Sequence, residues 1–154
     1  MKTSLIAMFS VLSLAAPALA QEGDIAAGEK EFNKCKACHM IRDDSGEDIV
    51  RGGRTGPNLY GIVGREIASV EGFRYGDGIR ALAEKNPGAS WDVNSLKAYV
   101  TDPTAYLKAH SGDDGARSMM TFKLNKNQDD LVAFLLSVSP DAPEQPASGD
   151  GAPQ

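Results

Sequence analysis

The stretch KCKACHM, residues 34–40, contains both cysteines of the chain, Cys35 and Cys38, and one of its two histidines, His39. Cysteines two residues apart can form a disulfide, hold a metal, carry out thiol redox chemistry or anchor a cofactor. At the end of a helix predicted over 25–35, these three side chains stand at i, i+3 and i+4 and would project from one helical face. The rest of the sequence discriminates between the four uses.

The first twenty residues, MKTSLIAMFSVLSLAAPALA, have the pattern of a secretory signal peptide. Lys2 supplies the positive start, residues 5–14 form an apolar run too short to span a bilayer, and ALA at 18–20 fits a cleavage site. We therefore expect cleavage after Ala20 and export to the periplasm of a chain that begins at Gln21.

The expected mature chain is acidic. Of 16 Lys and Arg only Lys2 would leave with the leader, so 15 bases would face 21 acids, a formal net charge of −6. Such a chain is a poor candidate for nucleic-acid binding, which needs clustered positive charge. We expect one domain over 21–139 and a disordered tail over 140–154, because the tail consists mainly of Pro, Ala, Gly and acidic residues.

Hydrophobic periodicity predicts a mostly helical chain with long loops, because little of the sequence alternates as strands do. Helices are expected over 25–35, 77–86, 92–102 and 128–138, the last capped by Asn127. Loops as long as the remaining ones usually surround something in a small domain, and a large apolar cofactor would serve.

An isolated cysteine pair is not a disulfide framework, and a bridge across two residues would restrain little of the unfolded chain. A thioredoxin-type pair needs a βαβ setting, and a structural zinc needs four ligands, for which the distant His110 is the remaining candidate. Covalent haem attachment requires two thiols spaced for the vinyl groups and a histidine for the iron, which is the pattern C-x-x-C-H. The pattern favours haem c, with zinc and a thiol redox pair as alternatives.

The second axial position of the iron would then decide the function. An open position suits a haem peroxidase or a gas-binding sensor, whereas a filled one restricts the protein to electron transfer. Met40 follows the proximal histidine directly and cannot reach the other face. The residues leave three candidates, which are His110, Met119 and Met120.

Six segments occur in the order found in class I cytochromes c: CKACH, TGPNLYGIVGR, GFRYGDGI, SW, AYVTDP and MTFK. Over residues 23–139 the chain most resembles the long periplasmic bacterial branch called cytochrome c2 or c550. The resemblance implies an all-α class I cytochrome c fold whose helices and long loops wrap around one covalently bound haem c. It also implies thioethers from Cys35 and Cys38 and axial ligation of the iron by His39 and Met120.

The same resemblance implies that the first and last helices cross, with Gly28 permitting a close approach, and it implies supporting residues at the haem. The Pro57 carbonyl would accept a hydrogen bond from the ring N–H of His39, and Tyr99 would either donate to the Met120 sulfur or pack in the core. The partners of the haem propionates would be Arg65, Tyr75 and Trp91. The segment 103–120 is longer than in short cytochromes c, so we expect an extended loop to carry the sixth ligand.

By this resemblance the protein is not an enzyme but a monomeric, single-haem periplasmic electron carrier. It would shuttle between a quinol-oxidising cytochrome bc1 complex and a terminal acceptor, either an oxidase, a photosynthetic reaction centre or a denitrification enzyme such as a periplasmic reductase. The alternative is a haem peroxidase or gas-binding sensor with an open distal site. Docking would be transient and steered by a basic ring around the haem edge. The expected members of this ring are Lys34, Lys36, Arg117, Lys123 and Lys126.

Overall fold

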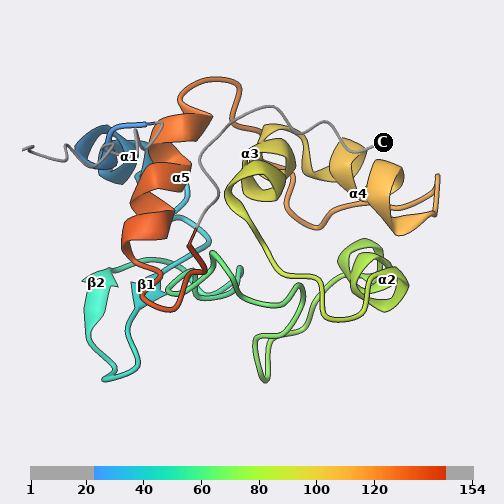
Figure 1. Cartoon of the computed structure of the whole chain (residues 1–154), viewed down its shortest axis with the longest axis horizontal. Helices are drawn as coiled ribbons and strands as arrows, with labels where there is room; N and C mark the ends of the chain where they lie inside the picture. Colours follow the sequence, from blue (N-terminus) through green and yellow to red (C-terminus); the bar gives the residue numbers. More distant parts are fainter. Residues whose placement is uncertain (1–22, 145–154) are drawn as a thin grey trace, which may run out of the picture.

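The structure is a computed structural model in which residues 23–144 are described. As predicted, the regular structure within these residues is mostly helical, and five helices are joined by long connectors (Figure 1). The expected signal peptide, 1–20, lies outside the described residues, as does most of the expected tail. The first residues of that tail are described, and Ala142 packs against the hydrophobic core.

The first and last helices, α1 (Ile25–Phe32) and α5 (Gln128–Ser137), cross each other on one side of the molecule (Figure 1). A Cβ atom at Gly28 would lie 2.7 Å from the Cβ of Phe134, so only glycine permits this approach. The rings of Phe32 and Phe134 meet edge to face at 5.8 Å. The predicted close crossing is therefore confirmed.

At the other end of the molecule, α2 (Asp77–Lys85) and α3 (Val93–Thr101) both pack against α4 (Pro103–Ser111). The expectation of an extended loop over the whole of 103–120 is wrong, because its first half is helical. Pro103 ends α3 but suits the first turn of a helix, and the side chain of Asp102 accepts the N–H of Ala105 at 3.0 Å as a cap.

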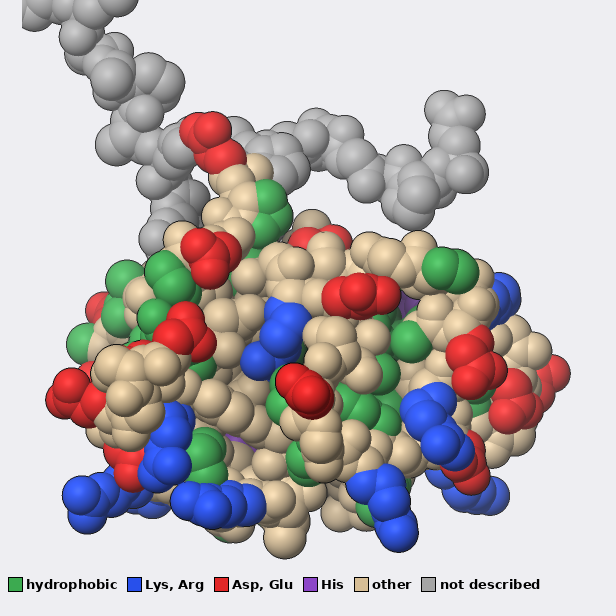
Figure 2. All heavy atoms as spheres, turned by 90° about the horizontal axis from the view of Figure 1, so that it is seen from below, with side chains coloured by type: hydrophobic (Ala, Val, Ile, Leu, Met, Phe, Trp, Pro, Cys, Tyr) green, Lys and Arg blue, Asp and Glu red, His purple; other side chains and the backbone are tan. Residues whose placement is uncertain are grey.

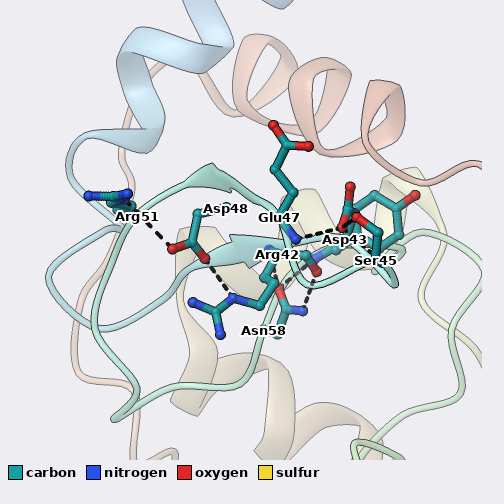
Figure 3. A network of polar contacts seen from close by, with 8 residues as sticks. Arg42, Asp43, Ser45, Glu47, Asp48, Arg51 and Asn58 are labelled. Carbon is teal, nitrogen blue, oxygen red and sulfur yellow. Dashed lines mark hydrogen bonds and ion pairs between the residues drawn. The ribbon is translucent and has the colours of Figure 1, made fainter.

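A short antiparallel hairpin, β1 (Ile41–Arg42) and β2 (Asp48–Val50), follows the histidine and was not predicted. Two and three residues are too few for an alternating pattern to show in the sequence. The turn between the strands is held by Asp43, whose Oδ1 accepts the N–H groups of Ser45 and Glu47 at 2.9 Å each (Figure 3). The hairpin is not part of a βαβ unit.

The connector from β2 to α2, residues 51–76, contributes Ile62, Val63 and Ile67 to the single core cluster. Its backbone is tied to Trp91, because the N–H of Gly64 donates to Trp91 O at 2.7 Å and that of Trp91 to Arg65 O at 2.9 Å. This long segment is thus an ordered layer of the domain. None of the helices within 23–144 is long and apolar enough to cross a membrane.

Candidate haem site

Cys35, Cys38 and His39 lie in a run of tight turns directly after α1, not in the helix itself. The prediction that one helical face presents all three is therefore wrong. The helix ends at Phe32, and the side chain of Asn33 donates to Lys30 O at 3.0 Å, a local bond that competes with further helix. The turns still keep the three residues together, because the N–H groups of Cys38 and His39 both reach Cys35 O at 3.0 Å.

A glycine-rich loop, residues 51–57, closes over these turns. The N–H of Gly53 donates to Lys36 O and that of Gly56 to Cys38 O, both at 2.8 Å. A Cβ at Gly56 would lie 2.6 Å from Nδ1 and 2.7 Å from Nε2 of His39, so the loop lies directly on the imidazole. No larger residue than glycine fits at this position.

The imidazole of His39 is held by the same loop. Its Nδ1 lies 2.8 Å from the carbonyl oxygen of Pro57, the arrangement that the resemblance implied. Nδ1 therefore carries the proton and donates it, which leaves the lone pair of Nε2 free to bind a metal. Burial lowers the pKa of His39, an effect that the Pro57 bond opposes and the charge of Arg65 reinforces. The ring is thus kept neutral, the form that binds a metal.

The two cysteines are both free thiols. Cys35 is half-buried, and burial, with a smaller effect of the nearby Glu31 carboxylate, raises the pKa of its thiol to about 11. Cys38 is exposed.

Arg65 is a half-buried cation that meets no carboxylate among the described residues. Its guanidinium donates to the backbone carbonyls of Tyr60 at 3.0 Å and Asn58 at 2.8 Å. Burial lowers its pKa, and the hydroxyl of Tyr75 is close enough to oppose that shift. A buried cation with only neutral partners is suited to an anion that enters with a ligand.

Trp91 is only 5% exposed and stacks against Tyr99, with ring centroids 4.9 Å apart. Its indole N–H makes no hydrogen bond within residues 23–144 and is free to donate to a ligand. The hydroxyl of Tyr75 accepts the N–H of Val70 at 3.2 Å and can still donate its own proton. The structure therefore leaves donors on all three expected propionate partners.

The three candidates for the sixth ligand have different surroundings. Met119 is 71% exposed and lies over Gly76, where a Cβ would come within 2.9 Å of its sulfur. His110 is exposed on α4 and stacks against Tyr106, with ring centroids 4.3 Å apart. Met120 is half-buried, as an inward-facing ligand would be.

Ser118 organises the Met120 segment and was missed by sequence reasoning. Its hydroxyl accepts the N–H of Met120 at 3.0 Å and pairs with the Tyr99 hydroxyl at 3.1 Å. The structure thus gives Tyr99 a different partner from the expected sulfur of Met120. A hydroxyl residue two places before a candidate ligand was the available signal, because such side chains often bond to the backbone two residues on.

Comparison with known proteins decides the family. No protein-family model matches the chain. The chain is 61% identical over 152 residues to cytochrome c-550 of Paracoccus versutus, covering 99% of both chains. It is 49% identical to cytochrome c2 of Rhodobacter capsulatus, covering 90% of this chain and 98% of the relative. The crystal structure of ferric cytochrome c-550 from Paracoccus versutus matches with a TM-score of 0.76 and 64% identity, covering 77% of this chain and all of that one.

This chain belongs to the class I cytochrome c family, in its cytochrome c2/c-550 branch. The predicted all-α class I fold is confirmed by the same comparisons. The cofactor is one covalently attached haem c, and proteins of this family are electron carriers.

The residues of this cytochrome c fit that cofactor. Two free thiols precede a neutral imidazole whose Nε2 is available to a metal. The imidazole lies so close to Gly56 that no larger residue fits at position 56. On another part of the site, the half-buried Arg65 guanidinium has only neutral carbonyl partners within residues 23–144, and the Trp91 indole N–H is still free to donate, so both could bind the carboxylate of a haem propionate. The zinc alternative gains no support, because within residues 23–144 no three His, Cys, Asp or Glu side chains are grouped as metal ligands.

Proposed function

We propose that this cytochrome c carries single electrons through the periplasm between a quinol-oxidising cytochrome bc1 complex and a terminal acceptor. The acceptor would be an oxidase, a photosynthetic reaction centre or a denitrification enzyme. The observation that carries the proposal is the orientation of His39, whose Nδ1 lies 2.8 Å from the Pro57 carbonyl while Nε2 stays free. Export would follow cleavage of the leader after Ala20.

Each site residue has a separate part in this proposal. Cys35 and Cys38 would hold the haem as thioethers, with His39 Nε2 and Met120 sulfur as the axial ligands. Arg65, Tyr75 and Trp91 would bind the propionates. When bound, the haem supplies a one-electron Fe(II)/Fe(III) couple whose potential thioether ligation raises. The chain contributes by holding the same ligands in both oxidation states, so that little has to move when an electron arrives.

The Pro57 carbonyl and the Ser118 hydroxyl support these ligands through hydrogen bonds. The first accepts a hydrogen bond from His39 Nδ1–H and so makes the imidazole a stronger electron donor. The second accepts the N–H of Met120 at 3.0 Å and fixes the backbone from which the sulfur projects. Filling the sixth position excludes peroxide and gases, which separates the electron carrier from the peroxidase or gas sensor.

The docking surface would be a basic rim around exposed apolar side chains. Figure 2 shows Lys and Arg side chains spread along the lower edge of one face, with apolar side chains between them. Near the Met120 segment, Met119 is 71% exposed and Phe122 40% exposed. Arg117 is exposed and has no ion-pair partner in the described part of the chain, as is true of Arg74 across a hollow of about 660 Å³. A monomer with such a rim can bind acidic partners transiently.

Two lysines of the expected ring contribute less positive charge than the sequence suggests. Lys34 pairs with Glu31 and Lys123 with Asp102, both at 2.6 Å. Among the described residues, the ammonium group of Lys36 bonds to the neutral side chain of Asn33 and to no carboxylate, so its charge is not cancelled. The steering charge therefore lies mainly with residues that have no ion-pair partner within 23–144, such as Arg117 and Lys126.

Replacing the sixth ligand tests the function. In oxidised Met120→Ala protein we expect the weak absorption band near the red end of the spectrum to disappear and the reduced protein to bind carbon monoxide. Met119→Ala is the matched control and should keep the band, because the Met119 side chain is exposed and lies over Gly76. Wild-type protein that lacks the band, or takes up carbon monoxide avidly, would favour the open-site alternative.

Electron-transfer rates test the docking surface. Between about 50 and 200 mM salt, the bimolecular rate with an isolated bc1 complex should fall steeply, because steering is screened over a Debye length of about 10 Å. Arg117→Gln should lower the rate at low salt more than Lys34→Gln, whose charge is already paired with Glu31. A salt-independent rate would contradict the basic rim.

A further inference from the structure

The side chain of Asn58, the residue after Pro57, makes three hydrogen bonds to backbone groups (Figure 3). Its Oδ1 accepts the N–H of Arg42 at 3.0 Å and that of Tyr60 at 3.1 Å. Its Nδ2 donates to Arg42 O at 2.7 Å. The amide therefore pairs with both backbone groups of Arg42, as a neighbouring strand would, and fixes the orientation of the side chain.

These bonds link the segment that follows His39 to the segment that follows Pro57. Arg42 is three residues after His39, and Asn58 is the residue that follows Pro57. The Pro57 carbonyl and the His39 ring are thus joined twice, once directly at 2.8 Å and once through Asn58 and the first strand. Displacing Asn58 would leave only the direct contact to set the distance between them.

The backbone of Asn58 serves the other end of the site. Its carbonyl oxygen accepts a hydrogen bond from the Arg65 guanidinium at 2.8 Å. The neighbouring N–H of Leu59 donates to Met40 O at 3.0 Å and adds a further tie between the two segments. One residue thus holds the proximal carbonyl with its side chain and the buried cation with its main chain.

We propose that Asn58 is a positioning residue that sets the geometry of the Pro57–His39 hydrogen bond and thereby tunes the potential of the iron. The inference rests on the proposed function, because the tuned quantity is that of a bound haem. A short bond from Nδ1 makes His39 a stronger donor and favours Fe(III). When Asn58 no longer fixes the loop, this bond weakens and Fe(II) is favoured.

The test compares Asn58→Ala with Asn86→Ala in the haem-loaded protein. Asn86 is a matched control, because its Nδ2 also bonds backbone carbonyls, those of Leu82 at 2.9 Å and His110 at 3.5 Å, but between α2 and α4. In Asn58→Ala the exchange of the His39 Nδ1 proton, followed by NMR, should accelerate up to about tenfold relative to wild type, the factor that corresponds to the loss of one ordinary hydrogen bond. The midpoint potential should rise in this variant and stay unchanged in Asn86→Ala.

Equal exchange rates and potentials in Asn58→Ala and wild type would overturn the proposal, as would equal effects of the two variants. If Asn58→Ala fails to mature, hydrogen exchange in the wild type decides. The amides of Arg42 and Tyr60 should be protected, and their rapid exchange would contradict the hydrogen bonds to Asn58. The proposed function fails differently, because wild-type protein would then lack the iron–methionine band or bind carbon monoxide. A red wild type with unaltered variants refutes only the role of Asn58.

Discussion

The two segments that hold the axial ligands are fixed in opposite ways. Around His39, the loop is held mainly by backbone bonds, because Gly53 and Gly56 donate to the turn at 2.8 Å, and the Pro57 carbonyl also accepts a hydrogen bond from the imidazole. Around Met120, side chains hold the chain, with the hydroxyl of Ser118 as the common partner. The proximal segment is thus held mainly by backbone hydrogen bonds, whereas the distal segment is held mainly by the side chain of one residue.

This difference predicts which ligand is released first under stress. Backbone bonds made by a glycine-rich loop persist through most side-chain substitutions, since no side chain makes them. The distal loop is anchored at Ser118, whose N–H donates to Thr104 Oγ1 at 3.2 Å, and at Leu124, whose N–H donates to Val100 O at 2.8 Å. A segment held by few contacts opens at a lower free energy than the core.

The largest expected effect comes from adding one methyl group to the proximal loop. Gly56→Ala places a Cβ 2.6 Å from His39 Nδ1, so the loop or the imidazole must move. We expect the free energy of unfolding to fall by about 3 kcal/mol and the yield of haem-loaded protein to drop, as measured by guanidinium denaturation and visible absorption. The matched change on the distal side is Gly115→Ala, where a Cβ would meet only the Asp113 carboxylate at 3.1 Å. Its effect should stay within about 0.5 kcal/mol, and equal losses in both variants would contradict the comparison.

A smaller effect is expected when the distal segment loses its hydroxyl. Ser118→Ala removes the acceptor of the Met120 N–H and the partner of the buried Tyr99 hydroxyl. We expect a loss of about 1 to 2 kcal/mol in stability and, on warming, earlier loss of the iron–methionine absorption band than of the helical circular dichroism. Ser69→Ala is the control, because its exposed hydroxyl bonds only to Glu66 O at 2.7 Å. If band and helix signal are lost together in Ser118→Ala, the distal segment is not the weaker one.

Sequence reasoning succeeded where a residue's chemistry is nearly independent of its surroundings. The spacing of Cys35, Cys38 and His39 indicated haem c, and the order of six motifs indicated the fold, both of which the comparisons confirm. The periodic helices α2, α3 and α5 were found close to their observed bounds. Each has an amphipathic pattern that local propensity and burial both favour.

The failures lie where a short-range competitor or a tertiary contact decides. Helix α1 was extended too far because the pattern does not reveal that the Asn33 side chain bonds to Lys30 O. Helix α4 was missed because Pro103 was taken only as the end of α3. Asn127 does lie at the start of α5, but in a left-handed conformation with φ 62° and with its amide on Glu31 at 3.0 Å, so it makes no side-chain cap. The roles of Asn58 and Ser118 depend on bonds between distant residues, which one sequence does not display.

The smallest expected effect concerns the ion pair that joins the distal loop to the start of α4. Lys123 Nζ lies 2.6 Å from Asp102, and this hydrogen bond, with the capped N–H of Ala105, lowers the pKa of the Asp102 carboxyl. A lowered folded-state pKa means that the contribution to stability is present above the unfolded-state pKa of about 3.9 and is lost as the pH falls through the folded value. Asp102→Asn keeps an acceptor for the cap but not the charge.

The variant should therefore be slightly less stable than wild type at pH 7, and the two free energies of unfolding should converge as the pH is lowered through the range below about 4. Guanidinium denaturation at a series of pH values measures the convergence, with the iron–methionine band as the local signal. Asp48→Asn is the proximal counterpart, because Asp48 pairs with Arg42 at 2.6 Å and its pKa is lowered chiefly by that bond. In the wild type, lowering the pH should weaken the iron–methionine band. Asp48→Asn should not change this response, because the hairpin that contains Asp48 supports the His39 segment and not the distal loop. A constant difference between Asp102→Asn and wild type from pH 7 to pH 3 would show that the loop is held by something other than this charge.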